Sequence, residues 1–246
     1  MTPADGFSHA PSTLPTDGFG PVPAVTSPPP TAPNSATETP PSPTAEALPP
    51  LPEAIGPKAL RDAAASGDPL AAVEVAARFA DGRGVPQDLP SAVSWYRRAA
   101  EAGLAPAQYR LGSLYEKGIG TARDAKAAAD WYAKAAALGN SKAMHNLAVI
   151  NAEGSLGAPD YAVAAKWFQE AAEHGIRDSQ FNLGILYARG LGVPRDLVTS
   201  YKWFALAATA GDTDSAKKRD DIAQALSKDD LARARLAVES WSAKPI

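Results

Sequence analysis

The chain has 246 residues, a formal net charge of −3 at pH 7 and no cysteine. Without cysteine it can form no disulfide, thiolate zinc site or cysteine nucleophile. Residues 1–54 hold five of the 27 acids and none of the 24 Lys and Arg, so residues 55–246 have 22 acids against 24 bases. A near-neutral folded part lacks the basic excess typical of nucleic-acid binders, and we expect no nucleic-acid partner.

The first 54 residues are rich in proline and contain 15 of the 23 prolines in the chain. A segment made mostly of Pro, Ser, Thr, Ala and Gly buries too little apolar area to offset its chain entropy. The composition therefore predicts a disordered, Pro-rich linker with local polyproline II character. A spacer role is favoured over a role as a ligand, because the proline runs lack the flanking basic residues common in SH3 ligands.

No apolar run in the chain reaches the ~18 residues of a membrane span, so we expect no transmembrane helix in it. The first residues contain no basic segment followed by an apolar one and so do not form a signal peptide. A tail of this kind ahead of a repeat array is typical of a piece of a longer protein, with a short intact protein as the alternative.

The folded domain is predicted to span residues 55–246. Its first element is a helix over residues 58–66, in which Ala63 and Ala64 are in phase with alanine pairs later in the chain. This helix resembles the second helix of a repeat unit without a partner. Such a helix is expected as a cap at the end of an array.

A period of 36 residues begins at Gly67. Matched residue types recur at many positions of this period, which is the signature of a solenoid. Four helix-pair units are predicted, at 67–102, 103–138, 139–174 and 175–210, followed by a C-terminal cap at 211–241. The recurring residues are glycines (Gly67, Gly103, Gly139, Gly175, Gly211), tryptophans (Trp95, Trp131, Trp167, Trp203) and the aromatic after each Trp (Tyr96, Tyr132, Phe168, Phe204).

The second unit illustrates how each repeat is expected to fold. Pro106 suits the first turn of a helix, where its missing N–H costs nothing. Gly118 ends this helix, and Asp124 is placed to cap the next one. Trp131 is predicted to fill the core between neighbouring units. Two sets of equivalent residues repeat these roles: the capping acids Asp88, Asp124, Asp160 and Asp196, and the small residues Ala76, Gly112, Ala148 and Gly184, which let the two helices approach closely.

The C-terminal cap is predicted to contain two helices. The first runs from about Asp214 to Leu226, and the second follows Ser227, which forms a weak capping box with Asp230. Trp241 lies two residues off the repeat period. Polar, off-register units are expected at the end of an array.

The segments 111–118 (LGSLYEKG) and 131–136 (WYAKAA) resemble Sel1-like repeats, the 36-residue relatives of the tetratricopeptide repeat. The resemblance covers residues 67–210 as four units. It implies an all-α, right-handed α-solenoid of paired antiparallel helices that binds other molecules. The third unit departs from the pattern, since Asn151 replaces the usual Tyr and Leu156 replaces the second glycine of the loop.

A narrower resemblance lies in the segments 105–111, 142–148, 178–184 and 211–220. These are similar to the C-terminal region of the PodJ family of alphaproteobacterial polar localisation factors. In that family a cytoplasmic coiled-coil part precedes one membrane span, and a Pro-rich linker and a Sel1-like array lie in the periplasm. The resemblance implies that this chain is a periplasmic piece of a membrane-anchored scaffold that recruits polar organelle and cell-division proteins.

The sequence contains no convincing catalytic or metal-binding pattern. His145 has no partner at metal-ligand spacing, and His9 and His174 are expected at the surface. The stretch from Gly118 to Gly120 lacks the third glycine and the preceding strand of a dinucleotide loop. The pairs of neighbouring aspartates near the C-terminus fit a solvated helix face. We therefore expect no enzyme, no cofactor and no metal.

The better candidates lie on the first helix of each unit, because these helices form the concave wall of a helix-pair solenoid. Asn residues recur at one position of this wall and resemble those with which tetratricopeptide grooves bind a peptide backbone. A side-chain amide suits this role because it both donates and accepts hydrogen bonds. Basic residues nearby can hold a peptide carboxylate. A solvated surface, or partial core packing of the rings, is the alternative. The predicted groove residues are Tyr109, Arg110, Lys117, His145, Asn146, Phe181, Asn182 and Arg189.

Three functions remain open. The leading one is a non-catalytic periplasmic scaffold that binds protein or peptide partners through the groove. The second is a periplasmic regulatory protein that restrains a sensor kinase, as some Sel1-like proteins do. The third is binding or processing of peptidoglycan or its stem peptides, and its enzymatic version ranks last because no nucleophile, metal set or acid pair supports it.

Overall fold

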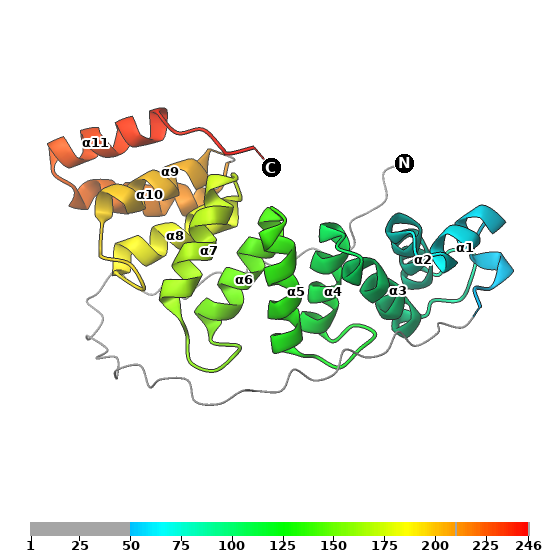
Figure 1. Cartoon of the computed structure of the whole chain (residues 1–246). Coiled ribbons are helices and arrows are strands. Elements are labelled where there is room, and N and C mark those ends of the chain that lie inside the picture. The colour runs from blue at the N-terminus through cyan, green and yellow to red at the C-terminus, as the bar shows by residue number, and fades with distance from the viewer. Residues whose placement is uncertain (1–49, 210, 246) are drawn as a thin grey trace.

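A computed structural model of the chain describes residues 50–209 and 211–245, and these residues form an elongated row of helices (Figure 1). Within them there is no strand, and one 3-10 helix, η1, precedes eleven α-helices. The predicted linker falls almost entirely outside the described residues. The elements are η1 Glu53–Ile55, α1 Lys58–Ala65, α2 Pro69–Asp81, α3 Leu89–Glu101, α4 Ala105–Lys117, α5 Ala125–Ala137, α6 Ser141–Glu153, α7 Tyr161–Glu173, α8 Arg177–Arg189, α9 Leu197–Ala208, α10 Thr213–Ala225 and α11 Lys228–Glu239.

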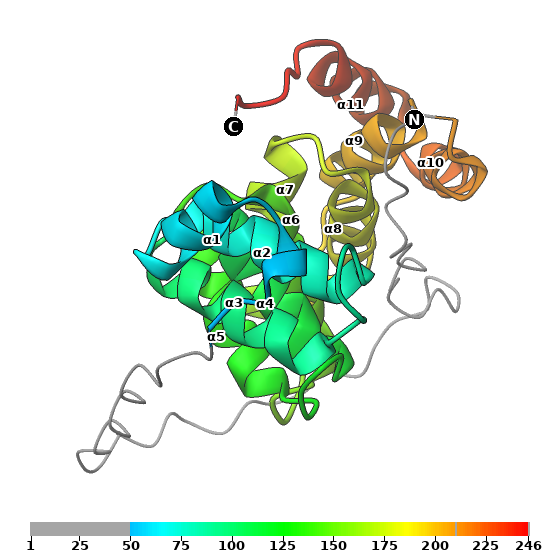
Figure 2. The same cartoon turned by 90° about the vertical axis from the view of Figure 1, so that its right-hand side faces the viewer.

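From α1 to α10 each helix packs against the next one in the chain, which confirms the predicted solenoid of helix pairs. Unit one is α2 and α3, unit two α4 and α5, unit three α6 and α7, and unit four α8 and α9. Viewed along the row, α1 to α5 lie in front, and α9 to α11 lie to one side (Figure 2). The turn in the row is made by successive small rotations between units.

The second helix of every unit starts at the aspartate that the sequence predicts. The side chain of Asp124 accepts a hydrogen bond of 2.9 Å from the backbone N–H of Ala127. Asp88, Asp160 and Asp196 cap α3, α7 and α9 in the same way. Each cap satisfies an N–H group that has no partner inside the helix.

Glycines at the loop between the two helices of a unit allow close approach to the preceding unit. Gly118 ends α4 in the left-handed conformation, with φ of 67°. Two residues on, a Cβ built on Gly120 would lie 2.5 Å from the carbonyl oxygen of Leu89. Gly192 lies equally close to Tyr161 of unit three. Leu156 takes this position in unit three, and its side chain is 51% exposed, so no such approach is made there.

The aromatic residue after each Trp forms the centre of its unit. Tyr132, Phe168 and Phe204 have no exposed surface. A Cβ on Gly112 would lie 2.8 Å from the ring of Tyr132, and one on Gly184 would lie 2.9 Å from the ring of Phe204. The small residues therefore admit these rings, as the predicted close approach requires.

The tryptophans divide into two groups. Trp95 and Trp203 are only 4% and 3% exposed, as predicted for core residues. Trp131 and Trp167 are half-buried and pack against the core clusters from their edge, so the predicted core position holds for them only in part. Consecutive helical residues point about 100° apart, and the following aromatic takes the inward direction. The Nζ atom of Lys134 lies 3.8 Å from the ring centre of Trp131 and covers part of its outer face.

The N-terminal cap is longer than predicted. Ala64 of α1 is fully buried, as expected for a capping second helix. Ile55 is also fully buried, its carbonyl oxygen accepts a hydrogen bond of 2.8 Å from Arg78 Nη1, and Leu51 packs on the same core cluster. A Cβ on Gly84 would lie 2.3 Å from the carbonyl oxygen of Ala54. Residues 51–54 thus belong to the folded part and replace the missing preceding unit.

The C-terminal cap contains the two predicted helices, α10 and α11. Ser227 accepts a hydrogen bond of 3.1 Å from the N–H of Asp230 at the start of α11. Helix α11 packs on α9, and the following segment returns to unit three. The ring of Trp241 lies 6.4 Å from that of Trp203, and the N–H of Lys244 donates a 2.7 Å hydrogen bond to the carbonyl oxygen of Glu173. The off-register Trp241 therefore closes the end of the array.

Candidate functional site

Three of the predicted groove residues, Tyr109, His145 and Phe181, pack on the central aromatic of their own unit. Ring centres lie 5.7 Å apart for Tyr109 with Tyr132, and 5.5 Å apart for Phe181 with Phe204. His145 lies 5.7 Å from Phe168, and its Nδ1 is 2.8 Å from Ser179 Oγ. Phe181 is buried, whereas Tyr109 and His145 are half-buried. The alternative of core packing thus holds for the rings.

Asn146 joins unit three to unit two. Its Nδ2 donates a hydrogen bond of 2.9 Å to the hydroxyl of Tyr132, and this hydroxyl donates one of 2.7 Å to Glu116 Oε2. Burial and the nearby Glu116 carboxylate raise the pKa of Tyr132 above its usual value. A buried network of this kind is costly to break, because each partner would lose a hydrogen bond without access to water.

Asn182 lies one unit further along at the same phase and is 1% exposed, while Asn146 is 7% exposed. In the unit before Asn182 the central aromatic is Phe168, which carries no hydroxyl. The prediction of a ligand-facing pair assumed exposed amides, and in this respect it is wrong, because both are covered where successive units pack. Ligand binding by them remains a prediction and would require a neighbour to move.

Arg110 occupies the same phase in unit two and has a different environment. It is half-buried and forms a side-chain hydrogen bond with Tyr96 of unit one. Burial raises the pKa of the Tyr96 hydroxyl, and the positive charge of Arg110 offsets part of this effect. Arg110 is the predicted groove residue that lines a pocket.

Lys117 and Arg189 lie in the last turns of α4 and α8. A cation there interacts favourably with the negative end of the helix dipole. Both are half-buried, and they are two units apart. The structure does not bring them to the pocket that Arg110 lines.

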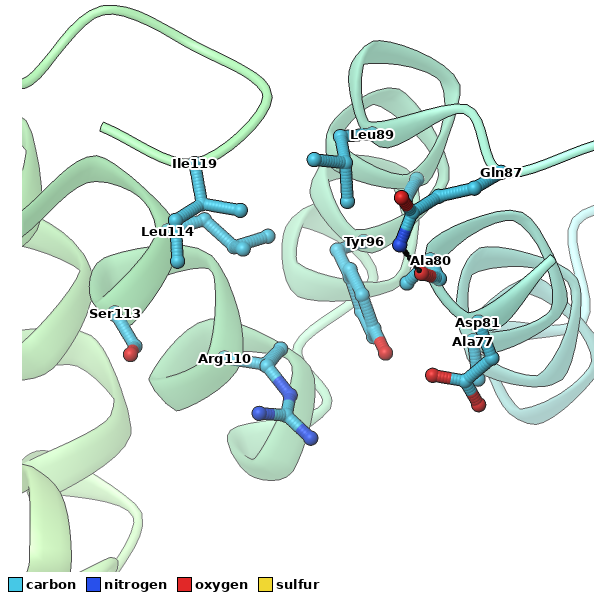
Figure 3. A pocket seen from close by; sticks show the side chains of 11 residues that line it. Ala77, Ala80, Asp81, Gln87, Leu89, Tyr96, Arg110, Ser113, Leu114 and Ile119 are labelled. Atoms are coloured by element: carbon cyan, nitrogen blue, oxygen red, sulfur yellow. Dashed lines mark hydrogen bonds between the residues drawn. The ribbon is translucent and has the colours of Figure 1, made fainter. Parts of the chain in front are cut away.

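The pocket lies between unit one and unit two and has a volume of about 490 Å³. Leu89, Leu114 and Ile119 provide apolar surface at one end of it, and Arg110, Asp81 and the hydroxyl of Tyr96 point together at the other end (Figure 3). Gln87 also lines the pocket and donates a 2.8 Å hydrogen bond to the carbonyl oxygen of Ala80. A pocket with apolar walls and a few convergent polar groups is typical of a ligand site.

Small side chains at one equivalent position, in the first helices of units one and two, leave this space open. Ala77 and Ser113 line the pocket from α2 and α4. The equivalent residues in units three and four are Val149 and Ile185, which are 6% and 3% exposed. A larger side chain at this phase therefore fills the space that the alanine and serine leave.

Sequence reasoning missed most of the pocket. No sequence pattern singles out Asp81, and Tyr96 appears in the sequence only as the recurring aromatic after Trp95. One pattern could have located the site. At the position of the repeat shared by residues 77, 113, 149 and 185, Ala77 and Ser113 are small, whereas Val149 and Ile185 are large. A comparison of side-chain volume between units, phase by phase, reveals it.

The described residues contain no group of three or more His, Asp or Glu side chains placed to hold a metal ion. Within the same part of the chain, no helix is both long and apolar enough to cross a membrane. The chemistry available in the pocket is apolar contact and hydrogen bonding to one guanidinium, one carboxylate, one phenol, one amide and one hydroxyl, from Arg110, Asp81, Tyr96, Gln87 and Ser113. These groups can bind and orient a ligand.

The fold and the pocket define a helix-pair α-solenoid with a pocket between its first two units. The Sel1 repeat family matches residues 69–104, 105–140, 141–176 and 177–212. The chain belongs to the Sel1 repeat family. The matched frame starts two residues after the predicted one, at the first residue of α2, and keeps the same 36-residue period.

Two solved structures are similar to the chain. One is a Sel1 repeat protein from Oxalobacter formigenes, with 36% identity, a TM-score of 0.59, and coverage of 66% of this chain and 47% of that one. The other is a protective antigen of uropathogenic Escherichia coli with an SLR fold, with 25% identity, a TM-score of 0.37, and coverage of 73% and 54%. The chain thus spans about half the length of these proteins. No curated protein matches it.

Proposed function

We propose that the chain is a non-catalytic scaffold that binds a protein or peptide partner, and that the pocket between units one and two receives a partner side chain. Sel1 repeat proteins generally serve as scaffolds for protein–protein interactions. The observation that carries the proposal is the pocket itself, with apolar walls next to Arg110. A buried apolar anchor beside a charged hydrogen-bond donor is the usual form of a hot spot.

The finer part of the proposal concerns place and partner. The resemblance to PodJ polar localisation factors supports a periplasmic location and a role in recruiting polar organelle or division proteins. It also supports a membrane anchor elsewhere in the full-length protein. These points rest on the sequence segments 105–111, 142–148, 178–184 and 211–220, and a fluorescent fusion imaged in cells before and after selective release of the periplasm tests them.

The binding role is tested with variants that fill the pocket with side chains found at the equivalent position of other units in this chain. Ala77→Ile and Ser113→Val place at the pocket the residue types that units four and three carry at the same phase. We expect both to reduce partner capture in pull-downs from a periplasmic extract, while a matched exposed change on α5, Asp130→Ala, leaves capture unchanged. Melting curves control for folding.

Purified peptidoglycan is tested in parallel as a second bait. Retention of the chain on peptidoglycan, unaffected by the pocket variants, would favour glycan binding over the proposal. Capture of a protein partner that Ala77→Ile does not weaken would move the binding site away from the pocket. Capture of a sensor kinase would favour the regulatory role.

A further inference from the structure

We infer that the pocket between units one and two binds an Asp-Gly-Phe segment of the same chain, Asp17-Gly18-Phe19, and that this contact competes with external partners. The inference uses the pocket of the proposed function and adds its occupant. Three independent observations carry it: the chemistry of the pocket, the composition of residues 1–49, and the point at which these residues join the array.

The pocket fits an aromatic ring beside a carboxylate. Its volume of about 490 Å³ lies within the range of small-ligand sites, about 300–1,000 Å³. A buried phenyl ring removes about 150–250 Å² of surface from water, and Leu89, Leu114 and Ile119 offer apolar contacts for it. Arg110 at the polar end can donate charge-assisted hydrogen bonds to a carboxylate.

The acid at the rim of the pocket does not repel such a ligand strongly. Asp81 forms an ion pair of 3.1 Å with Arg83, since its Oδ2 accepts from the Nε of that residue. Its negative charge is therefore compensated locally. Arg110, which hydrogen-bonds to Tyr96, adds a positive charge at the same end of the pocket.

Residues 1–49 carry the matching chemistry. They contain no Lys or Arg, and their only aromatic residues are Phe7 and Phe19. Each Phe follows Asp-Gly, so a ring and a carboxylate lie two residues apart both times. We assign the contact to the second copy because it lies nearer the array and because Pro21 follows Phe19 by two residues, whereas Pro11 follows Phe7 by four; the nearer proline lowers the entropy lost on binding.

The join between this segment and the array is close to the pocket. Ala54 contacts Gly84, which is three residues before the pocket residue Gln87. Thirty-one positions separate Phe19 from Pro50, the first described residue. For a random coil of this length the root-mean-square span is roughly 30 Å, which corresponds to a local concentration of the motif in the millimolar range.

The absence of cysteine from the chain permits a direct distance measurement. Spin labels on Thr16→Cys and Lys126→Cys in the full chain report the distance between the segment and α5 by pulsed electron resonance. We expect one narrow distance population in the parent chain. Phe19→Ala and the pocket-closing Ala77→Ile should broaden it, whereas Phe7→Ala, the matched control, should leave it narrow.

A broad distribution in the parent that Phe19→Ala does not change would overturn the inference. A narrow distance between two chains that each carry one label would show docking in trans and overturn the assignment to the same molecule. These outcomes leave the proposed function intact if Ala77→Ile still weakens capture of an external partner. Conversely, narrow distances without any captured partner would support the intramolecular contact and remove support from the scaffold role.

Competition provides a second measurement. A peptide of residues 13–23 should bind the full-length Phe19→Ala chain about tenfold more tightly than the parent, if the parent segment occupies its pocket about nine-tenths of the time. Equal affinities for the two chains would contradict occupancy of the pocket by Phe19. Pull-downs with Phe19→Ala should likewise recover more partner than the parent does.

Discussion

The Nδ2 atom of Asn146 donates a hydrogen bond of 2.9 Å to the hydroxyl of Tyr132, and this contact ties the first helix of unit three to the second helix of unit two. The same hydroxyl donates to the half-buried Glu116, so three polar groups from three helices satisfy one another where units two and three meet. Where unit three carries Phe168 in place of Tyr132, the residue equivalent to Glu116 is Ala152, which is 3% exposed. Unit three therefore lacks both the hydroxyl and the carboxylate of this network.

Asn146→Ala is expected to destabilise the fold, since it removes a buried partner of Tyr132. The loss should be about 1–3 kcal/mol, because the buried hydroxyl of Tyr132 loses the hydrogen bond that it accepts from Asn146. Urea unfolding of Asn146→Ala, Tyr132→Phe and the double variant measures it. Strictly additive effects of the two changes would contradict coupling through this hydrogen bond.

Phe204→Ala is expected to cost about 3–5 kcal/mol, because the ring has no exposed surface and fills the space above Gly184. Trp131→Ala should cost less, since the indole of Trp131 is half-buried. Denaturation midpoints of the two variants, compared with the parent, test the order. A larger loss for Trp131 would show that the tryptophan, and not the aromatic after it, is the main core residue.

Gly120→Ala should destabilise the array more than Gly139→Ala. Both glycines have positive φ, 71° and 85°, so both replacements suffer backbone strain of about 1–3 kcal/mol. A Cβ at Gly120 also meets the carbonyl oxygen of Leu89 at 2.5 Å, whereas one at Gly139 meets no atom within 4 Å. The difference in melting temperature between the two variants measures the destabilisation caused by the clash with Leu89. Equal melting temperatures would show that this clash costs no stability.

A chain that starts at Gly56 should melt at a lower temperature than one that starts at Pro50. The shorter chain loses the buried side chain of Ile55 and its hydrogen bond with Arg78. Burial of one such side chain is worth about 1.5–3 kcal/mol, or roughly 3–12 °C in a domain of this size. Unchanged melting of the Gly56 chain would show that η1 adds nothing to the cap.

Lys244→Met should reduce stability near neutral pH and have little effect in acid. Partial burial raises the pKa of Glu173, but hydrogen bonds from Lys244 and Gln169 outweigh this and hold it below its usual value. A lowered pKa in the folded state stabilises the protein above the unfolded carboxyl pKa, and this contribution disappears as pH falls through the folded value. Melting curves of parent and variant should converge below about pH 4. A constant difference at all pH values would exclude the ion pair as its cause.

The sequence alone determined the repeat architecture, because its causes are local. The 36-residue period, the capping aspartates such as Asp124, and the helix-ending glycines such as Gly118 act within a few residues of the chain and recur in every unit. Their helices consequently begin and end as predicted. The resemblance to Sel1-like repeats rests on the same short patterns, and the family match supports it.

Only the tertiary structure decided which side chains are available to a ligand. Asn146 and Asn182 have the residue type of a peptide clamp, yet contacts between successive units bury them. The inclusion of residues 51–54 in the cap depends on contacts of Ala54 and Ile55 with α2 and the loop after it. The pocket beside Arg110 exists because Ala77 and Ser113, from different units, are small at the same place. Exposure and cavity volume are sums over neighbours that are distant in sequence, and no local pattern fixes them.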